Sequence, residues 1–120
     1  LKSVNDNLTT IEKCNITLNS SNVSTKDSWI TCYKIGKMVM VKGKVKITKN
    51  AASYSGIKIA TGLPLSCDGG RVTSPPILID GDYSSCFLEM FGTNEMQISV
   101  RHKQVSANST FYFQFCYICV

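Results

Sequence analysis

Six side chains in predicted loops and strand ends are of the types that bind sugars. An exposed aromatic ring stacks on the apolar face of a sugar, while carboxylates and amides accept hydrogen bonds from its hydroxyl groups. One such loop is KNAASYSG, and a second, DGDYSS, follows the predicted strand PILID. The candidate ligand-binding residues are Tyr54, Asp80, Asp82, Tyr83, Arg101 and His102. They can form one site only if the fold brings these loops to the same rim.

The sequence gives little support to catalysis or metal binding. His102 is the only histidine, no Gly-x-Ser-x-Gly motif occurs, and no recognisable motif places two carboxylates for glycoside hydrolysis. The Asp-Gly-Asp sequence at 80–82 lacks the further ligands of a calcium loop, so a turn explains it. The CxxC sequence at 116–119 has no second CxxC to complete a tetrahedral zinc site. We therefore expect no enzymatic activity, no cofactor and no metal.

The cysteines leave two interpretations open. Six cysteines in a small secreted domain would form disulfides, and with Asn-x-Ser/Thr triplets they would indicate a secreted or viral surface glycoprotein. The triplets begin at Asn7, Asn15, Asn19, Asn22 and Asn108. The alternative is that the cysteines stay reduced and act as small buried hydrophobes within predicted strands. The cysteines in predicted strands are Cys32, Cys86, Cys116 and Cys119. We favour the alternative, because such triplets often arise by chance in an Asn- and Ser-rich chain.

Composition and charge indicate one globular domain of 120 residues with a net charge of +5. No apolar run approaches the ~20 residues of a membrane-spanning helix. The lysines are scattered along predicted strands, without the cluster of aromatic and basic residues that stacks single-stranded nucleic acid. We expect neither membrane insertion nor nucleic-acid binding. A polyanionic surface, such as a phosphate-rich cell-wall polymer, is compatible with the charge.

The elements that must position these residues begin with a predicted hairpin, WITCYKIGKMVMVKGKVKI, over 29–47. A turn at Gly36-Lys37 would place Cys32 opposite Val41 and Trp29 opposite Lys44. The predicted core face carries Ile30, Cys32, Val39, Val41, Val45 and Ile47. The predicted outer face carries Trp29, Tyr33, Ile35, Met38 and Met40, followed by Lys42, Lys44 and Lys46. The apolar part of the outer face must be covered, either by the same chain or by a neighbouring subunit.

The first segment shows a helical pattern instead. Leu1, Val4, Leu8 and Ile11 follow spacings of three, four and three, which is typical of a coiled-coil seam. We predict the end of a coiled-coil stalk over 1–18, a polar linker over 19–27 and a head domain over 28–120. A short amphipathic helix folded onto its own domain is the alternative.

The rest of the chain predicts an all-β head. Short strands alternate with Gly- and Pro-rich turns, which is typical of an antiparallel β-sandwich or jelly roll. The last strand, TFYFQFCYICV, is apolar on both faces and should be central in its sheet or buried at a subunit contact.

Three features follow one another along the chain. They are the segment YKIGKMVMVKGKVKI, the segment IATGLPL after a Gly-bearing loop, and further strands that lead to an aromatic C-terminal strand. This arrangement resembles the C-terminal head domains of bacteriophage tail fibres and baseplate receptor-binding proteins, over roughly residues 28–120. The resemblance implies a homotrimer on a coiled-coil stalk, with distal loops that contact a host surface, often a saccharide. It also implies a virion component at the tail tip or fibre, assembled in the bacterial cytoplasm.

On this interpretation the chain attaches a virion to a bacterial cell-surface saccharide or wall polymer. The predicted trimer interface comprises Leu1, Val4, Leu8, Ile11, Tyr33, Ile35, Met38 and Met40. A structural module that trimerises or caps a tail or baseplate protein, without binding a receptor, is the second hypothesis.

Overall fold

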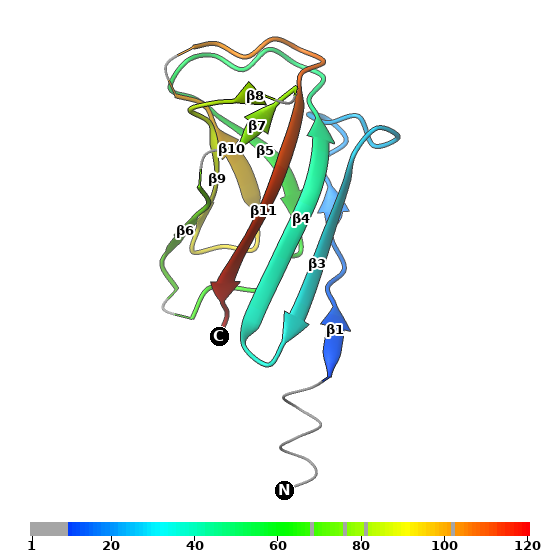
Figure 1. Cartoon of the computed structure of the whole chain (residues 1–120), viewed down its shortest axis with the longest axis vertical. Coiled ribbons are helices and arrows are strands. Elements are labelled where there is room, and N and C mark those ends of the chain that lie inside the picture. Colours follow the sequence, from blue (N-terminus) through cyan, green and yellow to red (C-terminus); the bar gives the residue numbers. More distant parts are fainter. Residues whose placement is uncertain (1–9, 68, 76, 81, 102) are drawn as a thin grey trace, which may run out of the picture.

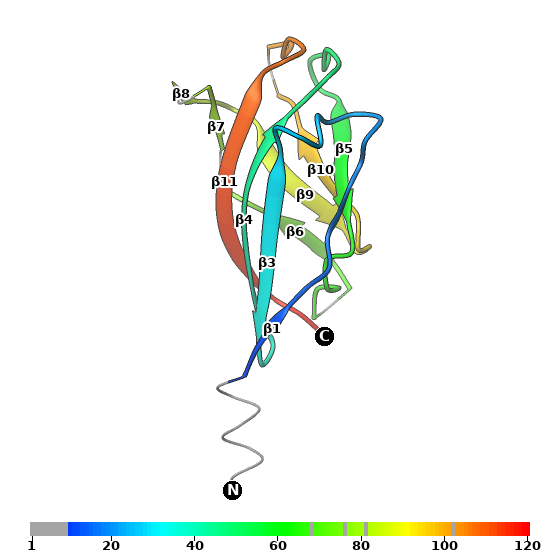
Figure 2. The same cartoon turned by 90° about the vertical axis from the view of Figure 1, so that its right-hand side faces the viewer.

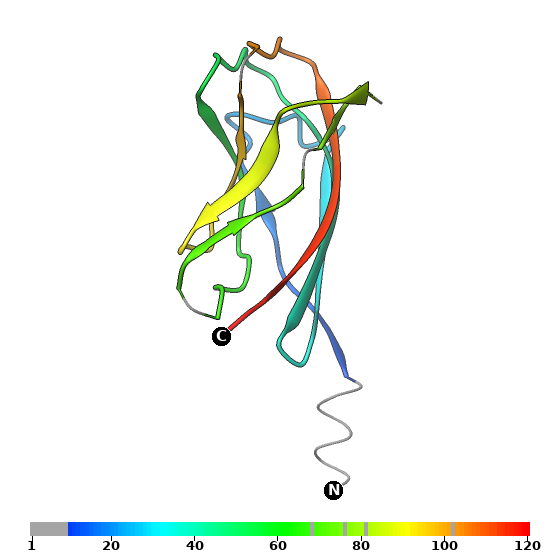
Figure 3. The same ribbon diagram turned by 60° about the vertical axis from the view of Figure 1, so that its left-hand side comes forward.

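The computed structural model describes residues 10–67, 69–75, 77–80, 82–101 and 103–120. These residues form two antiparallel sheets and no helix, which confirms the all-β prediction. The six-stranded sheet has the order β1-β3-β4-β11-β7-β8 and the five-stranded sheet the order β2-β5-β10-β9-β6. Figures 2 and 3 show the two sheets as the facing layers of a β-sandwich. No helix in this described part of the chain is long and apolar enough to cross a membrane.

The strands of the first sheet are β1 (Ile11–Lys13), β3 (Trp29–Ile35), β4 (Met38–Lys46), β7 (Leu78–Ile79), β8 (Asp82–Tyr83) and β11 (Thr110–Ile118). The strands of the second sheet are β2 (Thr17–Leu18), β5 (Gly56–Thr61), β6 (Arg71–Thr73), β9 (Phe87–Phe91) and β10 (Met96–Ser99). In Figure 1, β1, the β3–β4 turn and the C-terminus lie at one end, called here the β1 end. The loops 48–55 and 103–109 lie at the opposite end, called here the distal end.

The β3–β4 hairpin has the predicted register. Cys32 pairs with Val41 and Trp29 with Lys44, and Gly36 turns the chain with φ of 58°. A positive φ is accessible to glycine at little cost, so this residue suits a two-residue hairpin turn. The predicted core face is correct, because Cys32, Val39, Val41, Val45 and Ile47 are fully buried and Ile30 packs against them.

The last strand, β11, is central, as its two apolar faces predicted. It lies between β4 and β7, and Phe111, Phe113 and Phe115 enter the core between the sheets. Tyr117 closes this row by donating a hydrogen bond of 2.6 Å from its hydroxyl to the Pro64 carbonyl oxygen. The contact ties the Leu63-Pro64 element to β11.

The predicted helix is wrong over residues 11–18. Ile11–Lys13 extends the six-stranded sheet along the edge of β3, and Thr17–Leu18 pairs with β5. A β-branched segment such as this one gains more from the free backbone groups of a sheet edge than from an isolated helix turn. Leu1, Val4 and Leu8, the other residues of the predicted seam, lie outside the described residues.

Two further predictions need correction. Cys116 points out of the sandwich and is exposed, whereas Cys32, Cys86 and Cys119 are buried. Consecutive side chains of a strand point to opposite faces of the sheet. Because Phe115 points into the core, Cys116 points away from it. Val23, in the predicted polar linker, is buried and bridges to Ile47, so the linker contributes to the core.

Candidate functional site

The structure places the loops that carry the predicted binding residues at the distal end. Tyr54 lies between β4 and β5, Asp80 between β7 and β8, and Arg101 just after β10. Asp82 and Tyr83 form β8, but their side chains, like all of His102, lie outside the described structure.

Asp80 and Tyr54 shape their turns. Both have a positive φ, 51° and 57°. The Asp80 carboxylate accepts a hydrogen bond of 3.0 Å from the Thr110 backbone N–H, at the start of β11. Asp80 therefore uses its carboxylate to hold the turn. Tyr54 remains 68% exposed at the distal end.

Arg101 alone among the described candidates lines a pocket at the distal end. This pocket has a volume of about 440 Å³ and also holds Lys103 and Gln104. Four hydroxyl groups complete its polar lining, from Ser84, Ser85, Ser106 and Ser109. None of the described lining residues is acidic, so the pocket has the charge and the hydrogen-bond donors to bind an anion such as a phosphate.

A buried carboxylate positions Arg101. Glu89 is 2% exposed on β9, and its Oε1 lies 3.6 Å from the Arg101 guanidinium. The Ser99 hydroxyl donates a hydrogen bond to the same oxygen, and Arg71 approaches Oε2 at 3.4 Å. The Arg101 guanidinium also lies over the Phe87 ring, 5.3 Å from its centroid. These contacts restrain Arg101 while leaving its side chain 39% exposed.

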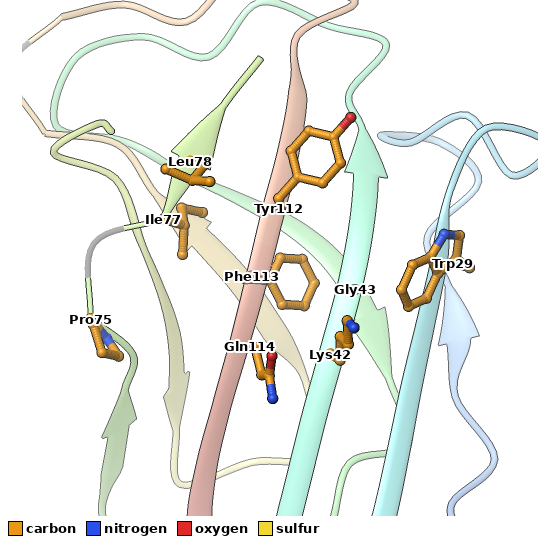
Figure 4. A pocket seen from close by; sticks show the side chains of 9 residues that line it. All are labelled: Trp29, Lys42, Gly43, Pro75, Ile77, Leu78, Tyr112, Phe113 and Gln114. Atoms are coloured by element: carbon orange, nitrogen blue, oxygen red, sulfur yellow. The ribbon is translucent and has the colours of Figure 1, made fainter. Parts of the chain in front are cut away.

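A second site lies on the outer face of the six-stranded sheet, the side turned away from the five-stranded sheet. Here a groove of about 330 Å³ runs across β3, β4 and β11 (Figure 4). It is lined by Trp29, Lys42, Gly43, Pro75, Ile77, Leu78, Tyr112, Phe113 and Gln114. Trp29 and Tyr112 are 44% and 41% exposed, so both offer ring surface to a ligand.

Strand register brings these side chains together. Trp29 and Tyr112 both pair with Lys44, from its two sides, so the aromatic residues lie in one row across the sheet. Lys42 pairs with Gln114 in the next row. Because paired residues share one face of a sheet, the two rows combine aromatic, amide and ammonium groups on the outer face.

Gly43 also lines the groove, one position before Lys44 on β4. A Cβ atom at this position would lie 2.5 Å from the Phe113 ring and 3.0 Å from the Trp29 carbonyl oxygen. The absence of a side chain therefore lets the Phe113 ring pack across β4 on the core side of the sheet.

Sequence reasoning missed this groove. Trp29 and Tyr112 could each be assigned to the outer face of a strand from the period of two. Neither pattern showed that β11 would pair with β4, and only that pairing puts the two rings in one row.

The predicted interface residues of the hairpin also lie together. Tyr33, Ile35, Met38 and Met40 share the outer face near the β1 end, and β1 adds Ile11 to the same face. Ile118 pairs with Met38 and extends the apolar surface onto β11. Ile11, Met38 and Ile118 are each exposed by about half or more, at 60%, 47% and 48%. We refer to these six residues as the apolar patch.

No protein-family model and no curated protein matches this sequence. A search of solved structures matches the head domain of the lactococcal phage bIL170, described as a receptor-binding domain, with a TM-score of 0.68 at 15% identity. The match covers 92% of this chain and 100% of the phage chain. It confirms the resemblance inferred from the hairpin and the Leu63-Pro64 element. The chain has the fold of a lactococcal phage head domain.

Proposed function

We propose that this chain is the receptor-binding head of a phage tail and attaches the virion to a saccharide or phosphate-bearing wall polymer of a bacterium. The fold carries the proposal, because it matches the whole length of a head domain described as receptor-binding. The two sites described above supply chemistry suited to such a ligand. The exposed positions of the sheet are rich in lysine, which favours an anionic polymer at long range.

The groove is the proposed sugar-binding site. A pyranose ring that lies over Trp29 or Tyr112, on either side of Lys44, would stack its C–H face on aromatic carbon, and Gln114 would donate to or accept from its hydroxyl groups. Lys42 would pair with a phosphate or carboxylate on the polymer. The distal pocket, with Arg101 and Lys103, is proposed as a second contact for charged groups of the same chain of sugars.

Trp29→Ala should weaken binding to the receptor by about tenfold, because one stacked ring contributes about 0.5–1.5 kcal/mol in addition to the apolar area that it buries. The measurement is binding of purified, fluorescently labelled head to a broad panel of bacterial strains, lactococci included, and to wall polysaccharide isolated from them. Phe91→Ala, which removes another exposed ring outside both cavities, is the matched control and should bind like the wild type.

The outcomes separate the hypotheses. Loss of binding in Arg101→Ala and Lys103→Ala, with none in Trp29→Ala, would move the sugar site to the distal pocket. Absence of binding by the wild type across the panel would contradict the receptor role and favour a structural trimerisation or capping module.

We also propose that the head acts as a homotrimer and that the apolar patch is buried in its interface. Three copies displayed on a common axis multiply weak sugar contacts into strong attachment, since linked sites raise the effective ligand concentration. The patch unites residues from β1, β3, β4 and β11, and such an exposed apolar surface needs a partner.

Met38→Asp should convert the trimer to a monomer, because the carboxylate would be buried against apolar side chains without a counter-ion. Light scattering at micromolar concentration measures the mass, and circular dichroism checks that the sheet is intact. Ser53→Asp adds the same charge to an exposed distal turn and should remain trimeric. A wild-type mass equal to one chain would overturn the proposed trimer.

A further inference from the structure

Three thiols gather near the β1 end of the sandwich. Cys14 follows β1, Cys32 lies in β3, and Cys119 follows β11. Cys14 is half-buried, while the other two are fully buried. All three are reduced in this structure.

Strand register sets Cys14 directly opposite Cys32. Lys13 pairs with Tyr33 in the β1–β3 ladder, so the next residues along the two strands are Cys14 and Cys32. The Cys14 backbone N–H donates a hydrogen bond of 2.8 Å to the Cys32 carbonyl oxygen, so the two residues lie opposite each other just past the last paired residues of the ladder. Opposed residues of this kind have Cα atoms about 5.5 Å apart. That separation is within the range that a disulfide spans.

The side chains also meet. Burial and a hydrogen bond with the Cys14 thiol raise the pKa of Cys32 to about 12. Cys119 follows β11, which β4 separates from β3, whereas Cys14 follows the strand that pairs directly with β3.

We propose that Cys14 and Cys32 form a disulfide when the protein leaves a reducing cytoplasm and meets a small-molecule disulfide. This cross-link is independent of the proposed receptor. It would link β1, an edge strand of the six-stranded sheet, covalently to the β3–β4 hairpin. In an assembled particle, the bond would strengthen the head at the place where the chain preceding β1 enters it.

The chemistry is a two-step exchange with a disulfide RSSR. The half-buried Cys14 attacks first as the thiolate, forms a mixed disulfide and releases RS⁻. The Cys32 thiolate then attacks the Cys14 sulfur and releases the second RS⁻. Two protein thiols are oxidised, one RSSR is reduced to two RSH, and the two protons pass to the released thiolates. The second step should be slow and should speed up as the pH rises, because Cys32 holds its proton tightly.

The test is incubation of the whole chain with oxidised glutathione at pH 8.5, followed by intact mass and peptide mapping without reduction. We expect a mass loss of about 2 Da and a linked peptide pair that contains Cys14 and Cys32. The melting temperature should rise by roughly 5–10 °C, because the bond closes a loop that spans β2 and the segment after it. Reduction should reverse both changes.

Matched variants complete the experiment. Cys14→Ser should gain no stability on oxidation, whereas Cys67→Ser, which removes an exposed thiol after β5, should behave like the wild type. A linked peptide between Cys32 and Cys119, a glutathione adduct alone, or no loss of thiols would each overturn the proposal. The peptide map of the wild-type chain shows directly whether Cys14 and Cys32 are linked, even if a variant fails to fold. These measurements need no receptor. If the disulfide does not form, the proposed receptor-binding function is unaffected, and if the head binds no receptor, the proposed disulfide is unaffected.

Discussion

Val41→Asp will prevent the head from folding. Val41 is fully buried on β4, paired with Cys32 on one side and Phe115 on the other. A carboxylate at this position would lose its water without gaining a cation or a hydrogen-bond donor. The effective cost of such burial is several kcal/mol, against a total stability of about 5–15 kcal/mol for a domain of this size. We expect purified or refolded protein to show no cooperative thermal transition by circular dichroism.

The control is the adjacent residue on the other face of the same strand. Lys42→Asp places the same carboxylate on the exposed outer face and should leave the melting temperature within a few degrees of the wild type. If Val41→Asp melted like the wild type, the β4 side chains would lie on the opposite faces, and the assigned core would be wrong.

Phe111→Ala will destabilise the head by about 3–5 kcal/mol, because it removes a fully buried ring and leaves a cavity between the sheets. Phe111 pairs with Val45 and Ile79 near the centre of the six-stranded sheet. The melting temperature should fall by roughly 10–20 °C, and urea unfolding should show an earlier midpoint with an unchanged slope.

Tyr112→Ala is the matched variant, one residue further along β11 and on the outer face. It should change stability little, since Tyr112 is exposed, but it should reduce binding to bacterial cells as Trp29→Ala does. Equal losses of stability in the two variants would contradict the assignment of these residues to different faces. Normal binding by Tyr112→Ala would remove this ring from the proposed sugar site.

Local patterns in the sequence were sufficient to predict the β3–β4 hairpin and the central position of β11. A turn at Gly36 and a period of two from Ile30 to Ile47 predict register and buried face together, because neighbouring residues alone decide both. The same reasoning placed the aromatic C-terminal strand at the centre of a sheet.

Local patterns failed where a distant partner decides the conformation. The heptad spacing up to Ile11 predicted a helix, but the free edge of β3 offers the backbone groups that make Ile11–Lys13 a strand. Likewise, the polar composition of residues 19–27 did not predict that Val23 would be buried in the core, where its backbone forms a β-bridge with Ile47.

The candidate site divides in the same way. Residue types alone identified Arg101, but its orientation depends on Glu89, a buried carboxylate on β9 whose partners come from separate strands. Trp29 and Tyr112 lie far apart in the sequence, and they share a row only because β4 pairs with β3 on one edge and with β11 on the other. A sequence determines which face of its own strand a side chain takes, since that follows from alternation along the backbone. Which strands become neighbours depends on how the whole core packs, and only the tertiary structure decided it.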